Sequence, residues 1–252
     1  MSTEMQPSRS YLVCCCERTG STLLEEALID TGVAGRPRSY FNPIASYTAR
    51  MRRLLKDASD DENYLHRVVV AATTENGVFG AKVHWAHFVN LISKLDGPSE
   101  PAMERLRRYF PDLRYIHLIR KNAVARAISH YRAKKTGLWH RDSTPDDSGG
   151  EGEPAFDFDQ IENFVRIGET EDATWRQFFA EHRIRPLQLV YEEMVADLAG
   201  TVGSVLAFLD IPAEGIRIKP PRLRRQADHR SREWEERYRR IAAVPFPLAG
   251  EG

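Results

Sequence analysis

Residues 11–24 read YLVCCCERTGSTLL, which is an apolar run, a turn of small residues and the beginning of a helical pattern. The run from Tyr11 to Cys16 has the length and composition of a buried strand. Apolar residues then recur at helical spacing, at Leu23, Leu24, Ala27 and Leu28. This order predicts a strand, a tight loop over residues 17–22 and a helix.

The same order of strand and helix repeats along the chain. Further strands are predicted at three apolar runs, Gly77–Val83, Leu113–Ile119 and Leu187–Tyr191. Helices are predicted at residues 85–95, 122–131, 164–179 and 195–209, with a mixed and mainly helical segment at 44–75. Asn122 is placed to cap one of these helices. The alternation predicts an α/β fold in which a parallel sheet is flanked by helices on both faces.

Length and composition restrict the class of protein. The chain has 252 residues, and we expect a single domain over residues 1–252. Apolar residues make up 42% and charged residues 29%, which excludes a disordered or fibrous chain. Basic and acidic residues both number 36, so the net charge of zero gives no general attraction to nucleic acid or to anionic membranes. Any site for an anion must therefore be local.

Targeting signals and cysteines point to a cytoplasmic protein. No run approaches the roughly 18 apolar residues of a membrane span, and the first ten residues lack the layout of a signal peptide. The three cysteines are adjacent, Cys14 to Cys16, so they form no disulfide framework and no metal-ligand pattern. We expect reduced thiols in a strand, with alternation burying one face of the trio, and no bound metal.

Two segments have unbalanced charge. Residues 142–159 contain seven acidic residues and no basic one, along with glycines and prolines, which predicts a mobile loop or lid. Residues 222–240 contain eight arginines against four acidic residues. Within the second segment, residues 232–240 are typical of a solvated basic helix face, with Trp234 and Tyr238 packing inward.

The loop at residues 17–22 is suited to bind an anion. A loop that leaves a strand and enters a helix points backbone N–H groups at its ligand, and the helix dipole favours negative charge there. Gly20 permits the turn, and Arg18 adds a charged fork that fits phosphate or sulfate oxygens. An ordinary strand-to-helix turn is the alternative interpretation. The loop lacks the G-x-x-x-x-G-K-[ST] and G-x-G-x-x-G spacings, which argues against an ATPase or a dehydrogenase.

A second basic residue stands at the end of another predicted strand. Arg120 follows His117-Leu118-Ile119 and would lie at the carboxyl edge of the sheet, where open α/β sheets bind ligands. Ser129 lies in the predicted helix that follows. Two basic sites at one edge imply two anionic groups on the ligand, although a structural ion pair is an equal alternative for Arg120 alone.

Together these motifs resemble the sulfotransferases that use 3′-phosphoadenosine-5′-phosphosulfate (PAPS), most closely the bacterial trehalose sulfotransferase family. The similarity runs in order from about Tyr11 to about Arg240 and includes the segment Thr31-Gly32-Val33-Ala34-Gly35. It implies the sulfotransferase fold, whose parallel sheet is P-loop-like. It also implies PAPS as donor, 3′,5′-adenosine bisphosphate (PAP) as product, and no metal.

The resemblance implies which residues hold the donor. Five loop residues would wrap the 5′-phosphosulfate: Arg18, Thr19, Gly20, Ser21 and Thr22. Arg120 and Ser129, nine positions apart, are similar to the 3′-phosphate site of the family. Tyr191, followed by Glu192-Glu193, resembles the tyrosine that flanks adenine. Three residues of the C-terminal segment would close over the donor: Arg224, Arg225 and Gln226. Which of these two arginines reaches a phosphate stays open.

The chain departs from the family at the catalytic base. The resemblance places a glutamate base at the position of Ser39, and serine accepts a proton poorly near neutral pH. Lys82-Val83-His84 resembles the Lys-x-His strand of cytosolic sulfotransferases, which implies His84 as base and Lys82 as a contact of the sulfuryl group. Arg18 would stabilise the leaving phosphate. A structural role for His84 is the alternative, which would leave Glu17, Glu25 or the acidic loop to supply the base.

The combined prediction is an enzyme that moves a sulfuryl group by in-line displacement to a hydroxyl of a carbohydrate or other small biosynthetic acceptor. The alternatives are an ATP-dependent small-molecule kinase and a catalytically degenerate adenine-nucleotide-binding protein. We expect residues 39–64 and 142–159 to meet the acceptor, and the acidity of the second segment favours a cationic acceptor such as an amino sugar. Three tryptophans are more typical of a core than of an acceptor pocket: Trp85, Trp139 and Trp175. A homodimer is left open by the sequence.

Overall fold

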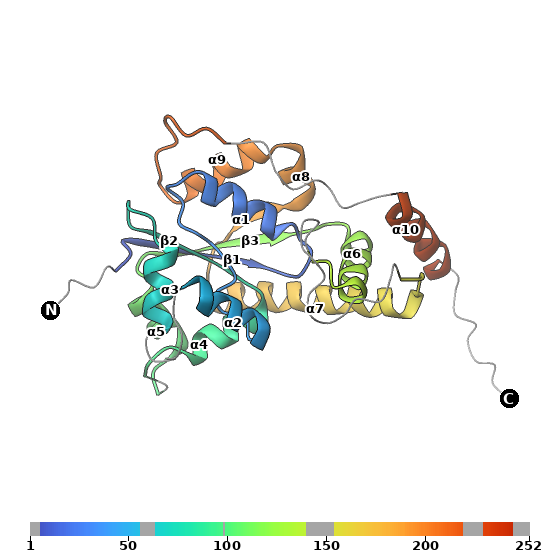
Figure 1. Cartoon of the computed structure of the whole chain (residues 1–252), viewed down its shortest axis with the longest axis horizontal. Helices are drawn as coiled ribbons and strands as arrows, with labels where there is room; N and C mark the ends of the chain where they lie inside the picture. The colour runs from blue at the N-terminus through green and yellow to red at the C-terminus, as the bar shows by residue number, and fades with distance from the viewer. Residues whose placement is uncertain (1–5, 56–63, 98, 140–153, 219–228, 244–252) are drawn as a thin grey trace. The chain divides into compact units, whose positions relative to one another are not determined.

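A computed structural model describes residues 6–55, 64–97, 99–139, 154–218 and 229–243 (Figure 1). The chain divides into two compact units. The first combines residues 1–121 with 171–221, and the second combines residues 122–170 with 222–252. Most of the predicted acidic loop and the predicted closing residues Arg224, Arg225 and Gln226 lie outside the described residues.

The first unit contains a sheet whose described strands are all parallel. In spatial order they are β2 (Val78–Val83), β1 (Arg9–Cys15), β3 (Leu113–Ile119) and β4 (Leu187–Val190). Val13 of β1 pairs with Lys82 on one side and with Ile116 on the other. The predicted parallel sheet and its strands are confirmed, with ends that differ by one or two residues.

Helices cover both faces of this sheet (Figure 1). The side chains of Leu12 and Cys14 enter one buried cluster, and those of Tyr11, Val13 and Cys15 enter the other. A strand buried on both faces has no polar side to show, so it reads as a continuous apolar run. The expectation that alternation buries one face of the cysteine trio is therefore wrong, because Cys14, Cys15 and Cys16 are all buried.

Among the described residues, α1 (Ser21–Asp30), α8 (Tyr191–Ala196) and α9 (Leu198–Phe208) pack on the face that holds Val13. The other face is covered by α2 (Ala45–Leu54), α3 (Tyr64–Ala72), α4 (Trp85–Ser93), α5 (Ala102–Tyr109) and the end of α7 (Phe158–Glu181). No helix among the described residues is long and apolar enough to cross a membrane.

One predicted helix, at residues 195–209, is two helices in the structure. The backbone of Asp197 is not helical, with φ −141° and ψ 82°, so α8 ends there. The Asp197 carboxylate then accepts a hydrogen bond from the Gly200 N–H and caps α9. An aspartate between two apolar stretches is a helix start signal, and its side chain satisfies an N–H that the first turn leaves unpaired.

The described part of the second unit is helical. It contains α6 (Ala123–Thr136), the first part of α7 and α10 (His229–Ala242). The Asn122 side chain accepts a hydrogen bond from the Ala125 N–H, which confirms the predicted cap of α6. Trp234 and Tyr238 are buried in one cluster with Phe164, which confirms the predicted inward face of the basic helix.

Candidate active site

The loop between β1 and α1 closes on itself through a buried threonine. The Thr19 hydroxyl is fully buried and donates a hydrogen bond to the Cys16 carbonyl over 3.0 Å. Arg18 and Gly20 both adopt left-handed backbone conformations, with φ 64° and 82°. A Cβ on Gly20 would lie 2.4 Å from the ring of Tyr191, so both the turn and this packing require glycine.

Helix α1 begins at Ser21 with Gly20 in the cap position. Glycine has no side chain to cap the helix, and no side-chain hydrogen bond caps α1 among the described residues. The N–H groups of the first turn and the positive end of the helix dipole therefore face the loop without a side-chain cap. Such a helix start accommodates a phosphate or a sulfuryl group.

Arg18 and Arg120, which are 102 positions apart in the sequence, meet beside this loop. Nη1 of Arg120 donates a hydrogen bond to the Arg18 carbonyl over 3.1 Å, and the Arg120 guanidinium lies 4.5 Å from the centre of the Tyr191 ring. Burial lowers the pKa of Arg18, Glu17 opposes this shift, and the charge of Arg120 adds to it. Two neighbouring cations at the carboxyl edge of the sheet favour a bound anion.

Lys82 forms a buried ion pair with Glu25. Its Nζ lies 2.7 Å from Oε2 of Glu25, and both side chains are about nine-tenths buried. Burial by itself lowers the pKa of Lys82, but Glu25, together with Tyr47 and Cys15, outweighs burial and holds the pKa above its ordinary value. Nη1 of Arg38 lies 3.7 Å from the other oxygen of Glu25. Lys82 is therefore a fixed positive charge at neutral pH.

His84 stands at the junction of β2 and α4. It occupies the cap position of α4, its Nδ1 lies 3.1 Å from Oε1 of Glu17, and its side chain is 12% exposed. Its Nε2 is buried and has no hydrogen-bond partner among the described residues. Burial lowers the pKa of His84, but Glu17 and Cys15 outweigh it and hold the pKa well above its ordinary value.

Two further groups surround the His84 ring. The ring of His87 stacks on it with 4.5 Å between the centres, and burial followed by the charge of His84 lowers the pKa of His87 to about 3. The carboxylate of Glu171 accepts a hydrogen bond from the Trp85 N–H over 2.8 Å. Ser39, at the position where the resemblance places a glutamate, is buried.

The other residues predicted to bind the sulfuryl donor lie in several parts of the chain. Ser129 lies in α6 of the second unit. Tyr191 begins α8, and its ring packs against Gly20. The C-terminal residues 224–226 lie outside the described part of the chain. The structure thus brings Arg18 together with Arg120, and His84 together with the loop residue Glu17.

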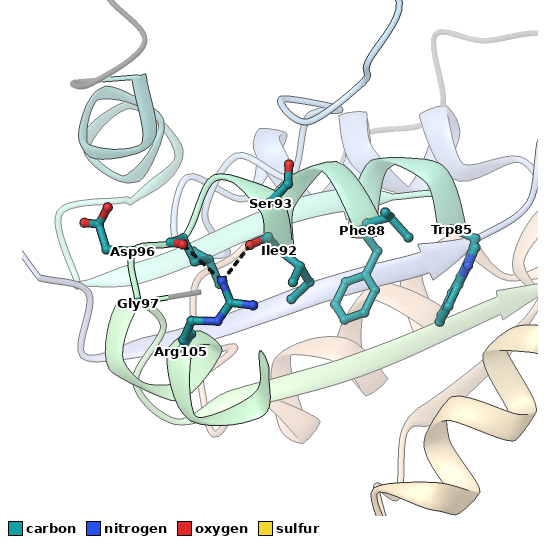
Figure 2. A pocket seen from close by; sticks show the side chains of 9 residues that line it. Trp85, Phe88, Ile92, Ser93, Asp96, Gly97 and Arg105 are labelled. Atoms are coloured by element: carbon teal, nitrogen blue, oxygen red, sulfur yellow. Dashed lines mark hydrogen bonds between the residues drawn. The ribbon is translucent and has the colours of Figure 1, made fainter. Parts of the chain in front are cut away.

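A hollow of about 520 Å³ lies along α4 and α5 (Figure 2). Trp85, Phe88 and Ile92 line it from α4, and Arg105 of α5 donates hydrogen bonds to the Ile92 and Leu95 carbonyls beneath it. None of the predicted catalytic or donor-binding residues lines this hollow. Trp175 is fully buried, and its ring centre lies 5.0 Å from that of Trp85, which confirms that Trp175 belongs to the core.

Comparison with known proteins assigns the chain to a family. The model of the Stf0 sulphotransferase family matches residues 10–241. This chain belongs to the Stf0 sulphotransferase family. It is 30% identical to the trehalose 2-sulfotransferase of Mycolicibacterium smegmatis, over 92% of this chain and 95% of that enzyme. It is 28% identical to the trehalose 2-sulfotransferase of Mycobacterium tuberculosis, over 92% of this chain and 94% of that enzyme.

Among solved structures, this chain is similar to the sulfotransferase domain of a Synechococcus olefin synthase, with 14% identity and a TM-score of 0.47 over 97% of this chain and 90% of that chain. It is also similar to a sulfotransferase from Alicyclobacillus acidocaldarius, with 13% identity and a TM-score of 0.48 over 90% of this chain and 89% of that chain. The family match and the curated relatives confirm the predicted family, and the protein is a sulfotransferase.

Besides the contact of Glu17 with His84, sequence reasoning missed two contacts at this site. It did not pair Glu25 with Lys82, although Glu25 interrupts the apolar stripe of α1 and an acidic residue there needs a buried cation. It also did not place Glu171 beside His84. No local pattern predicts the position of Glu171, because it lies in a polar stretch of α7, 86 positions from its hydrogen-bond partner Trp85.

The described residues contain no group of three or more His, Cys, Asp or Glu side chains arranged to hold a metal ion. Arg18, Lys82 and Arg120 bring positive charge to the site. The arrangement provides fixed cations at the loop and a histidine at the end of the neighbouring strand.

Proposed function

We propose that this sulfotransferase uses PAPS as donor and sulfates a hydroxyl of a carbohydrate or other small biosynthetic molecule. The observation that supports this most is the meeting of Arg18 and Arg120 at an uncapped helix start, because PAPS has anionic groups at both its 5′ and 3′ positions. The described residues fit PAPS because they offer backbone N–H groups and positive charge to its anionic groups. The names of the two curated relatives support a sugar as acceptor.

Donor binding is divided among several segments in this proposal. The loop holds the 5′-phosphosulfate through five residues: Arg18, Thr19, Gly20, Ser21 and Thr22. Because the Thr19 hydroxyl is already used inside the loop, Thr19 contributes its backbone N–H. Arg120 and Ser129 bind the 3′-phosphate, Tyr191 lies near adenine, and the C-terminal residues Arg224, Arg225 and Gln226 close over the donor. A single sulfotransferase domain over residues 1–252 is part of this proposal.

The chain supplies three kinds of help to the reaction. When bound, PAPS supplies a sulfuryl group that is already activated by its phosphate leaving group. His84 takes the proton of the acceptor hydroxyl at Nε2. Lys82, held in its charged form by Glu25, stabilises the oxygens of the sulfuryl group, and Arg18 stabilises the charge that develops on the leaving phosphate.

The first test is a calorimetric titration with PAP, beside ADP and ATP with Mg²⁺. We expect PAP to bind tightly and ADP weakly, because only PAP has a 3′-phosphate for Arg120. Arg120→Ala should weaken PAP binding by about 10- to 100-fold, which corresponds to the loss of charged hydrogen bonds worth about 1.5–3 kcal/mol. The exposed Arg107→Ala in α5 is the matched control and should bind PAP as the parent does.

A preference for ATP with Mg²⁺ would favour the kinase alternative, although the loop lacks the lysine of the G-x-x-x-x-G-K-[ST] motif. PAP binding without turnover on a broad acceptor panel would favour the degenerate binding protein, which the loss of glutamate at Ser39 motivates. Absence of binding to all three nucleotides would reject the proposal.

The acceptor is best identified by a panel of purified sugars. We propose a small hydroxyl compound as the partner and expect transfer to trehalose or a related sugar, with amino sugars favoured if the acidic segment at residues 142–159 meets the acceptor. Transfer of sulfate from radiolabelled PAPS measures this directly. Equal rates with neutral and cationic sugars would reject the role of the acidic segment. We also propose a cytoplasmic location, which suits three neighbouring cysteines that form no disulfide among the described residues.

A further inference from the structure

The ring of His84 has two nitrogens in different surroundings. Nδ1 lies 3.1 Å from Oε1 of Glu17, which is within hydrogen-bond distance. Nε2, on the opposite side of the ring, is buried without a hydrogen-bond partner among the described residues. A carboxylate accepts but does not donate, so the proton of a neutral His84 belongs on Nδ1. Nε2 then keeps its lone pair and is the nitrogen that can accept a proton.

The backbone fixes both members of this pair at one edge of the sheet. Glu17 comes two residues after the end of β1, and His84 comes directly after β2. The two strands are parallel neighbours, in which Cys14 pairs with Val83. Glu17 also directly precedes Arg18 of the anion loop. A carboxylate of the loop itself therefore lies beside the histidine.

Four other groups face or adjoin the pair and decide its charge. Cys15 of β1 favours the imidazolium through its charge and through a side-chain hydrogen bond with His84. Glu171 of α7, which holds the Trp85 N–H, also favours the imidazolium, while burial raises its own pKa. The stacked His87 has a pKa of about 3, so it is neutral at neutral pH, and the charge of Lys82 contributes to that lowering. Glu17 is the carboxylate in direct contact with the ring.

We propose that Glu17 is a positioning residue that holds His84 in the tautomer and orientation needed to act as the catalytic base. The pair takes the place of the single glutamate that is absent at Ser39. This inference rests on the proposed sulfuryl transfer and assigns Glu17 a role other than that of the base itself. Glu17 acts through His84 and does not itself take the proton of the acceptor.

The proton and bond changes balance without a further reactant. The acceptor hydroxyl gives its proton to Nε2 of His84 as its oxygen forms a bond to sulfur. The bond between that sulfur and the 5′-phosphate oxygen breaks, and PAP leaves with the electron pair. His84 is then an imidazolium that Glu17 stabilises, and it returns the proton to solvent.

The test compares Glu17→Gln with the parent enzyme by histidine NMR and by the pH dependence of kcat/KM. Removing the charge of Glu17 removes the largest of the influences that favour the imidazolium, so the pKa of His84 should fall. Activity requires neutral His84 and rises with pH through this pKa, so the acidic limb of the profile should move to lower pH. We expect kcat to fall by about 10- to 100-fold, the range that the loss of an orienting partner costs at metal-bound histidines.

Controls separate positioning from other roles. Glu17→Asp keeps the charge and should retain more activity than Glu17→Gln, and the exposed Glu75→Gln should behave as the parent does. An unchanged His84 titration and an unchanged profile in Glu17→Gln would overturn the proposal. Full loss of the acidic limb in Glu17→Gln, with activity retained in His84→Asn, would also overturn it, because Glu17 would then be the base.

The NMR titration is done without donor or acceptor, so its result does not depend on turnover. If the parent protein does not transfer sulfate from PAPS but Glu17→Gln still lowers the His84 pKa, the proposed function fails while the contact is established. If PAPS turnover is normal and the His84 titration does not respond to Glu17→Gln, the positioning role fails while the function stands.

Discussion

His84→Ala is expected to lower kcat by about 10²- to 10⁴-fold, the usual contribution of a general base, and to leave PAP binding unchanged. The physical reason is that Nε2 of His84 is the proposed proton acceptor, whereas the proposed donor contacts are made by the loop and Arg120. Steady-state sulfate transfer measures the first effect, and calorimetry with PAP measures the second.

The exposed histidine of α3, changed as His66→Ala, is the matched control and should leave both quantities unchanged. Unaltered turnover in His84→Ala would reject His84 as the base. In that case Glu25→Gln and Glu17→Gln become the decisive variants, because these two carboxylates lie beside Lys82 and His84. A loss of PAP affinity that equals the loss of kcat would instead indicate a damaged loop.

Lys82→Met is expected to lower the free energy of unfolding by about 3–5 kcal/mol. The substitution keeps most of the volume of the side chain but leaves the Glu25 carboxylate buried with its closest cation removed, and breaking a buried pair from one side costs about this much. Arg38, at 3.7 Å from Glu25 and with a side chain 42% exposed, compensates only in part. Urea unfolding followed by circular dichroism measures the change.

Two comparisons make this prediction specific. Removing both charges, in Lys82→Met with Glu25→Gln, should recover a large part of the lost stability, because an unpaired buried charge is then absent. Lys121→Met breaks an ion pair with Glu193 in which both side chains are more than half exposed, and it should leave stability unchanged. If Lys82→Met and Lys121→Met were equally stable, the Glu25 pair would have no structural importance.

The double variant also separates stability from catalysis. If Lys82 stabilises the sulfuryl oxygens, sulfate transfer should stay low in Lys82→Met with Glu25→Gln even where stability returns. Recovery of full activity together with stability would show that Lys82 has only a structural role. The two readouts therefore test separate parts of the proposal.

Local pattern in the amino-acid sequence was enough to predict the framework. The strand at Tyr11–Cys16 and the helix after it follow from the spacing of apolar side chains, which depends only on near neighbours. The cap at Asn122 and the inward face of Trp234 and Tyr238 follow for the same reason. Order along the chain, strand then helix, was enough to predict the parallel sheet.

The sequence also located the candidate site through a resemblance, and the family match confirms that resemblance. Arg18, Lys82, His84 and Arg120 all stand at or near the carboxyl ends of predicted strands, and parallel strands bring such ends to one edge. Their roles toward donor and acceptor are still predictions. What sequence reasoning could name was the residue types present at that edge, together with Glu17 and Glu25 as alternative bases.

Only the tertiary structure decided which of these side chains touch. The partners are far apart in the chain, 57 positions for Lys82 and Glu25 and 102 for Arg120 and Arg18, so no local spacing could pair them. Burial of all three cysteines likewise needed helices on both faces of the sheet. Periodicity determines which face of a strand or helix is apolar, whereas contact between side chains depends on how separate elements pack, and for that reason the Glu17–His84 pair became visible only in the folded chain.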